Sequence, residues 1–72
     1  MKAKDLLALL SREPLAYYVH RQKGSHKTLC SEKYPTLTFA FHSGQTIPPG
    51  MVRKILIKDV GLTPDEISAL LS

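Results

Sequence analysis

The hydrophobic positions at the start of the chain follow a helical period. Four apolar side chains have the spacing i, i+3, i+4 and i+7, which places them on one stripe of an α-helix: Ala3, Leu6, Leu7 and Leu10. Pro14 disfavours helical backbone geometry at the residue before it, so a helix has to end there. The pattern therefore predicts an amphipathic helix over residues 2–12.

Residues 15–41 are rich in the β-branched and aromatic residue types that favour strands. Gly24-Ser25 interrupts this stretch once, and the segment from Ser31 to Pro35 interrupts it again. The stretch is thus predicted to form three strands. Alternation is clearest in the third strand, over 36–42, where every second residue is large and apolar and should face the core: Leu37, Phe39 and Phe41.

The same alternation assigns side chains to the other face of the sheet, which we call the open face. In the second strand Leu29 should lie in the core, and the residues that alternate with it should lie on the open face: His26, Thr28 and Cys30. In the third strand the corresponding residues are Thr36, Thr38, Ala40 and His42. His26 and His42 are therefore expected to share the open face. In the first strand, either Tyr17 and Val19 or Tyr18 and His20 could face the core, and the sequence leaves this choice open. As residue types, three aromatic side chains are interpreted as core residues: Tyr17, Tyr18 and Phe39.

Two helix signals follow a loop over residues 43–50. Pro48-Pro49 suits the start of a helix, and apolar residues then recur with helical period up to the C-terminal cap Gly61: Val52, Ile55, Leu56 and Val60. Thr63-Pro64-Asp65-Glu66 has the form of a capping box, which predicts a last short helix. Leu62 should staple onto Ile67, with Leu70 and Leu71 completing an apolar stripe.

These elements predict one domain over residues 1–72 of the α+β class. The expected order is a helix, a three-stranded antiparallel sheet, a helix and a short C-terminal helix, with the helices on one face of the sheet. A single cysteine excludes an internal disulfide and a zinc site built on cysteine pairs. The apolar run Leu6–Leu10 is too short for a signal peptide or a membrane span. We therefore expect a cytoplasmic protein with no membrane contact and no cofactor.

The positive charge of the chain is concentrated in its middle. Ten Lys and Arg against six Asp and Glu give a net charge of +4. Residues 14–42 carry four basic and one acidic side chain, and they also hold all three histidines: His20, His26 and His42. This distribution favours a polyanionic partner.

The most informative segment is Arg21-Gln22-Lys23-Gly24-Ser25-His26-Lys27. A glycine in a tight turn lets the backbone approach a ligand closely. Backbone N–H groups, the Ser25 hydroxyl and the ammonium groups of Lys23 and Lys27 could then surround a phosphate. Histidine can exchange protons near neutral pH, so His26 suits general acid–base work on a phosphodiester. A basic turn of this composition is more often a solvated hairpin without chemistry.

The segment R-Q-K-G-S-H occurs in a wider arrangement. A leucine-rich helix precedes it, a strand ending in His42 follows it, and the later motifs are Ile47-Pro48-Pro49-Gly50 and Val60-Gly61-Leu62-Thr63. In these features nearly the whole chain resembles the HicA family of bacterial toxins, small mRNA interferases that are paired with a HicB antitoxin. One departure is at residues 13–17, where family members commonly have a glycine–aromatic pair before the first strand.

The resemblance implies a fold like the double-stranded RNA-binding domain. It also implies metal-free, ribosome-independent cleavage of mRNA, growth arrest, and inhibition by a HicB-type antitoxin. The catalytic histidine of the family falls in the G-S-H motif, which here is Gly24-Ser25-His26. His42 matches a further histidine that is often seen after the third strand.

A mechanism follows as a hypothesis. His26 would remove the proton of a ribose 2′-hydroxyl, which attacks the adjacent phosphorus to give a 2′,3′-cyclic phosphate. Arg21, Lys23 or Lys27 would stabilise the charge of the phosphoryl oxygens, and His42, His20 or water would protonate the leaving oxygen.

Two other functions use the same residues without chemistry. A non-catalytic module could bind double-stranded RNA through its shape and phosphates. A protein-binding adaptor could use the open face as its docking surface. Arg53, Lys54 and Lys58 are interpreted as a solvated helix face, with RNA phosphate contact as the alternative.

Overall fold

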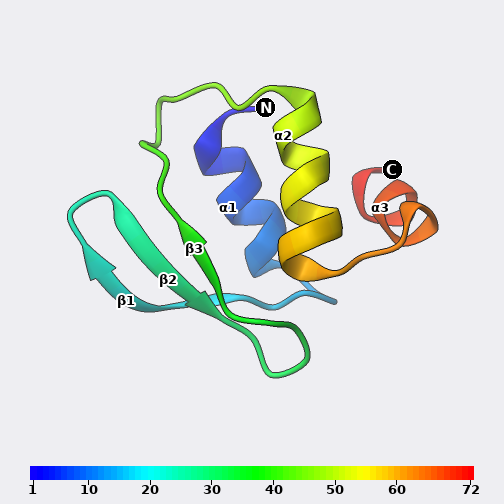
Figure 1. The fold of residues 1–72 in the computed structure, drawn as a ribbon, viewed down its shortest axis with the longest axis horizontal. Helices are drawn as coiled ribbons and strands as arrows, with labels where there is room; N and C mark the ends of the chain where they lie inside the picture. The colour runs from blue at the N-terminus through cyan, green and yellow to red at the C-terminus, as the bar shows by residue number, and fades with distance from the viewer.

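The computed structural model describes all 72 residues as two layers, with helices against one face of an antiparallel sheet (Figure 1). The elements in chain order are α1 (Ala3–Ser11), β1 (Tyr18–Lys23), β2 (His26–Cys30), β3 (Leu37–Phe39), α2 (Pro49–Lys54), the π-helical segment η1 (Ile55–Val60) and α3 (Pro64–Leu71). This confirms the predicted α+β class, the element order and the placement of the helices.

Helix α1 forms where the apolar period predicts it. Three of the four residues that the period selects are buried, namely Ala3, Leu6 and Leu10, and Leu9 is buried with them. The fourth, Leu7, is only half-buried. The start of α1 is held against the loop before α2, because the N–H of Ile47 donates to the carbonyl of Met1 at 2.7 Å. The N–H of Ala3 donates in the same way to Gln45, at 2.8 Å. These bonds join segments more than forty residues apart.

The sheet has the strand order β1-β2-β3 with antiparallel pairing throughout. β1 and β2 pair from Tyr18 opposite Cys30 to Lys23 opposite His26, with an irregularity between Val19 and Arg21. β2 and β3 pair over three positions, from Leu29 opposite Leu37 to Lys27 opposite Phe39. Directly opposite residues lie on the same face of a sheet. Buried Leu29, Leu37 and Phe39 therefore define the core face, and the alternating residues lie on the open face.

The third strand is shorter than predicted. Pairing stops at Phe39, and the chain from Ala40 onward belongs to a loop. His42 therefore lies outside the sheet and cannot share its open face as a strand residue, which corrects our expectation. Apolar alternation alone extends to Phe41, but a strand also needs pairing with a neighbour, and the pairing of β3 with β2 ends at Phe39 opposite Lys27.

The first strand resolves the choice that its sequence left open. Tyr17 is buried and Val19 lies opposite Leu29, so this pair faces the helices. Tyr18 faces the other way and is 56% exposed, so its interpretation as a core residue is wrong. Just before the strand, Ala16 has a φ of +50°, in the left-handed region that favours glycine. The family resemblance leads to a glycine near this position, whereas this chain has alanine in the left-handed conformation.

The C-terminal helices keep the predicted boundaries with one change of winding. Pro49 is the first residue of α2, and Gly61, with a φ of +88°, ends the helical segment as predicted. The six residues before Gly61, which form η1, are wound as a π-helix. Its buried residues continue the line of Val52 at intervals of four: Leu56 and Val60.

Helix α3 begins with the predicted capping box. The N–H of Glu66 donates to Thr63 Oγ1 at 3.2 Å, and the N–H of Thr63 donates to Glu66 Oε1 at 2.9 Å. Leu62 and Ile67 are both buried, as the predicted staple requires. Leu71 is 47% exposed, so it does not complete the stripe and that part of the prediction is wrong.

A single core connects the two layers. Fifteen residues are buried, all of them apolar or aromatic, and every helix and two of the strands contribute to them. No polar side-chain atom is buried without a hydrogen-bond partner. The residues are Ala3, Leu6, Leu9, Leu10, Leu15, Tyr17, Leu29, Leu37, Phe39, Ile47, Val52, Leu56, Val60, Leu62 and Ile67.

Tyr17 provides a test of this packing. Its hydroxyl donates to the carbonyl of Pro35 at 2.6 Å. Burial, and then the nearby Tyr34, Asp59 and Cys30, raise the pKa of Tyr17 above its ordinary value of about 10. The folded protein therefore keeps this proton when the unfolded chain loses it. The resulting stabilisation is complete below about pH 10 and is lost as the pH rises through the folded-state pKa.

We accordingly expect Tyr17→Phe to unfold more easily at pH 7, by about 1 kcal/mol for the lost hydrogen bond. Above pH 10 its free energy of unfolding should fall less steeply than that of the wild type. Urea unfolding at several pH values measures both. The control is Tyr18→Phe, because Tyr18 is exposed; equal pH slopes for the wild type and Tyr17→Phe would contradict the expectation.

Candidate functional site

The basic segment forms the tip of the β1–β2 hairpin. Gly24 and Ser25 are the two loop residues between the paired residues Lys23 and His26. Gly24 has a φ of +61°, and Ser25 is not among the residues with positive φ. Positive φ at the first loop residue only is the pattern of a type II′ turn, which uses glycine there. Gln22 Nε2 donates to the carbonyl of Gly24 at 3.2 Å.

The hairpin brings three of the predicted site residues onto the open face. Lys23 lies directly opposite His26, and Arg21 lies opposite Thr28, the next open-face residue of β2. All three of Arg21, Lys23 and His26 are exposed. Neither β1 nor β2 contains an acidic residue. One histidine thus stands beside two cations on a face that solvent and a large substrate can reach.

Lys27 lies on the other face of β2. It pairs with buried Phe39, and it lines a cavity against α1 rather than the open face. The sequence suggested that Lys23 and Lys27 surround one phosphate because both flank the turn. Strand alternation separates them instead, since Lys27 is the neighbour of His26 along the strand.

The other two histidines are placed differently. His20 is exposed in β1, in the irregularity between Val19 and Arg21. His42 is exposed in the loop after β3, where its N–H donates to Gln45 Oε1 at 3.3 Å and its carbonyl accepts from the N–H of Gln45 at 2.9 Å. No group of three or more His, Cys, Asp or Glu side chains has a metal-binding arrangement.

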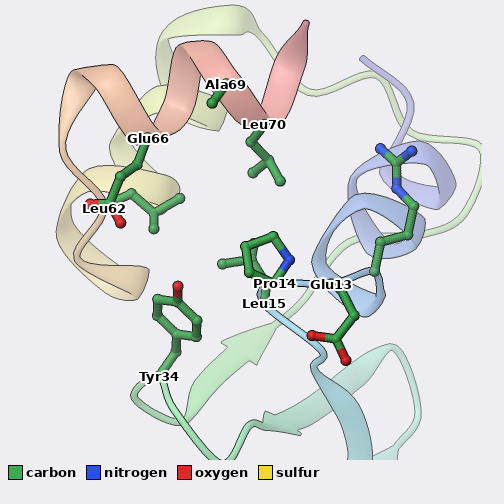
Figure 2. A pocket seen from close by; sticks show the side chains of 9 residues that line it. Glu13, Pro14, Leu15, Tyr34, Leu62, Glu66, Ala69 and Leu70 are labelled. Carbon is green, nitrogen blue, oxygen red and sulfur yellow. The ribbon is translucent and has the colours of Figure 1, made fainter.

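Two surface cavities were not expected from the sequence. The first, of about 300 Å³, lies between α3, the turn after α1 and Tyr34 of the β2–β3 loop (Figure 2). Its walls are largely apolar, and Glu13 and Glu66 contribute carboxylates to it. It lies at the end of the sheet opposite the Gly24-Ser25 turn. The second, of about 320 Å³, lies between α1 and the core face of the sheet and includes Lys27.

The residues that sequence reasoning missed are aromatic. Phe41 is half-buried at the second cavity, and its ring meets that of Phe39 edge to face, with centroids 5.2 Å apart. Tyr18 stands on the open face beside the basic residues of β1. The signal for Phe41 was its position at the end of an alternating run, where a side chain is only partly covered.

None of the helices has the length and hydropathy that a bilayer crossing requires. No curated protein matches the sequence, and no solved structure matches it either. A family model described as the HicA toxin of bacterial toxin–antitoxin systems matches residues 3–62, which include every element from α1 to η1 and the whole hairpin. The chain therefore belongs to the HicA family of toxins.

Proposed function

We propose that this toxin is a metal-independent endoribonuclease that cleaves mRNA, with His26 as its general base. The observation that carries the proposal is the cross-strand pair of Lys23 and His26 at the exposed tip of the hairpin, with Arg21 on the same face. Membership of a toxin family supports the proposal, because a toxin needs a target whose destruction stops growth, and mRNA is such a target. A proton acceptor and two cations at one accessible place suit a phosphodiester of RNA.

The proposed reaction needs a base and charge stabilisation. His26 takes the proton of a ribose 2′-hydroxyl, and the 2′-oxygen forms a bond to the adjacent phosphorus. The bond from phosphorus to the 5′-oxygen breaks, which leaves a 2′,3′-cyclic phosphate on one fragment and a 5′-hydroxyl on the other. The leaving oxygen takes up a proton, for which water, His20 and His42 are the candidate donors.

Arg21 and Lys23 have the electrostatic role in this proposal. Negative charge on the non-bridging phosphoryl oxygens grows as the 2′-oxygen attacks, and nearby cations lower the energy of that state. A guanidinium can bind two of those oxygens at once, whereas an ammonium acts as a point charge. Both side chains are exposed, so their effect should weaken as salt is added.

The direct test is cleavage of a single-stranded RNA by the purified chain in EDTA, with analysis of the product ends. We expect 2′,3′-cyclic phosphate and 5′-hydroxyl ends. Ends with 3′-hydroxyl and 5′-phosphate would contradict the role of the 2′-hydroxyl. Salt-sensitive RNA binding without any cleavage would favour the alternative function, a double-stranded RNA-binding module of the same fold.

A toxin of this family has a cognate antitoxin as its partner. We propose that this antitoxin is of the HicB type and inhibits the toxin by covering the open face and the Gly24-Ser25 turn. The lack of acidic residues in β1 and β2 supports an acidic partner there, and exposed Tyr18 offers it an apolar contact. Hydrogen exchange of the complex should show protection at this turn; a turn that stays unprotected would point to inhibition at a distance.

A further inference from the structure

We propose that the cavity between α1 and the sheet is a nucleotide-binding subsite, which holds the base next to the cleaved phosphodiester of single-stranded RNA. The proposal rests on RNA being the substrate and adds a place that selects and positions it. It assigns a role to Lys27, which the open face does not use, and to Phe41, which belongs to neither the sheet nor the sealed core.

The cavity has the size and the lining of a small-ligand site. Its volume of about 320 Å³ is within the range of pockets that bind small molecules. Leu7 of α1 and the rings of Phe39 and Phe41 form an apolar wall. The polar groups come from Lys4, Ser11, Lys27 and Ser43. An apolar wall with a few polar groups is the usual composition of a binding pocket.

The chemistry of this lining fits a base and its phosphate. The half-buried ring of Phe41 leaves part of its surface free for stacking, and an aromatic ring can stack with any nucleobase. Lysine side chains line a pocket with their methylene stems and keep the ammonium group in water. Lys4 and Lys27 therefore present their charges at the mouth, where the phosphate of a bound nucleotide would lie.

The charges distinguish this cavity from the one in Figure 2. That other cavity has a comparable volume and apolar walls, but Glu13 and Glu66 supply two carboxylates and Arg12 only one cation. The cavity against α1 has two lysines and no acidic residue in its lining. A polyanion is therefore attracted to the cavity against α1 and not to the one beside α3.

The position of the cavity connects it to His26. Lys27 follows His26 along β2, so the two side chains leave the strand on opposite faces at adjacent positions. Pairing with β3 ends at Lys27, whereas β1 and β2 continue to the pair Lys23 and His26. In Figure 1 the chain after β3 turns away from the hairpin. An RNA strand with a phosphate at His26 can thus pass the end of β3 and place its next base on Phe41.

The first test uses the fact that the chain contains no tryptophan. In a Phe41→Trp variant the single indole reports on stacking. We expect adenosine monophosphate to quench its fluorescence in a saturable way, and inorganic phosphate alone to leave it unchanged. Tyr34→Trp places the same indole at the cavity of Figure 2 and is the matched control, in which no quenching should occur.

The second test measures how binding depends on salt. An oligodeoxynucleotide, which lacks the 2′-hydroxyl and is not cleaved by the proposed reaction, serves as the probe. We expect Lys4→Gln and Lys27→Gln each to lower the slope of log affinity against log salt by about 0.7, the value for one phosphate contact on a single strand. Lys33→Gln, in the β2–β3 loop, should leave the slope unchanged. Phe41→Leu should weaken binding at least about fivefold through the lost stack.

The outcomes separate this inference from the proposed function. The subsite would be overturned, and the ribonuclease left intact, if cleavage depends on His26 while the Phe41→Trp variant shows no quenching and the lysine variants keep the wild-type salt slope. Quenching without any cleavage would overturn the ribonuclease, and with it the placement of the cavity beside a cleaved phosphodiester, and would leave a nucleotide-binding cavity for RNA that is bound but not cut. An oligonucleotide that binds no more tightly than adenosine monophosphate would also overturn the proposal, because the cavity would then bind free nucleotides and not a segment of RNA.

Discussion

His26→Ala should lower the rate of RNA cleavage by about 10²- to 10⁴-fold, the usual contribution of a positioned general base. Alanine cannot accept the proton of the 2′-hydroxyl, so the attack on phosphorus then depends on water as the base. Arg21 and Lys23 remain in place, and RNA binding should persist. The measurement is the single-turnover rate in EDTA with the protein in excess over RNA, beside RNA affinity on an uncleavable oligonucleotide.

The structure explains why this variant should still fold. His26 is exposed at the first position of β2, and its side chain lies on the face opposite the core. Substitutions at exposed positions away from special backbone features usually change stability by less than about 0.5 kcal/mol. The turn glycine, whose positive φ the hairpin requires, is untouched. Circular dichroism and urea unfolding should therefore match the wild type.

Cys30→Ala is the matched control for His26→Ala. It replaces a side chain on the same strand and the same open face, at the far end from the turn. Its cleavage rate should stay close to that of the wild type. A His26→Ala protein that cuts within about threefold of the wild-type rate would remove His26 from the mechanism. A variant that binds RNA normally while neither it nor the wild type cuts would point to the RNA-binding module.

Features governed by residues close in sequence were predictable. The spacing of apolar residues in α1 and the box at Thr63-Glu66 each depend on a few consecutive positions, and each formed where predicted. Gly61 also adopts the left-handed conformation that its place after a helix predicts. Local propensity and the final packing agree at these positions, so nothing in the tertiary structure overrides them.

The errors arose where a feature depends on distant pairing. The length of β3 is set by how far it pairs with β2, and the alternation in residues 36–42 carries no information about that pairing. The irregularity at His20 in β1 is equally a property of the pair of strands. The π-winding of η1 had no sequence signal that we recognised.

The candidate site shows a different kind of error. The period of two in β2 was already sufficient to place Lys27 opposite to His26, because Leu29 fixes the core face. Grouping Lys23 and Lys27 by their distance in sequence from the turn ignored that period. Alternation also places Tyr18 on the open face once its neighbour Tyr17 is known to face the core. The sequence did predict the turn itself, which the structure places at Gly24-Ser25 between the paired residues Lys23 and His26.

The position of His26 depends on the core beneath β2, and Leu29 is the residue that tests this. It is fully buried, whereas its direct partner Val19 is 46% exposed. Deleting most of a buried leucine side chain costs about 2–5 kcal/mol. A chain of this length has a total stability of about 4–11 kcal/mol. Leu29→Ala should therefore remove a large share of the free energy of unfolding.

Urea unfolding of Leu29→Ala beside Val19→Ala measures this difference at two residues that face each other across the same strands. We expect the midpoint to fall sharply for Leu29→Ala and by a small amount for Val19→Ala, with the m-value unchanged in both, because the area exposed on unfolding is nearly the same. Cleavage by Leu29→Ala should decline only to the extent that the protein unfolds, and added antitoxin should restore its fold by binding the native state. His26→Ala loses activity with the fold intact, so a Leu29→Ala protein that stays fully folded but inactive would show that β2 contributes to catalysis by more than its packing.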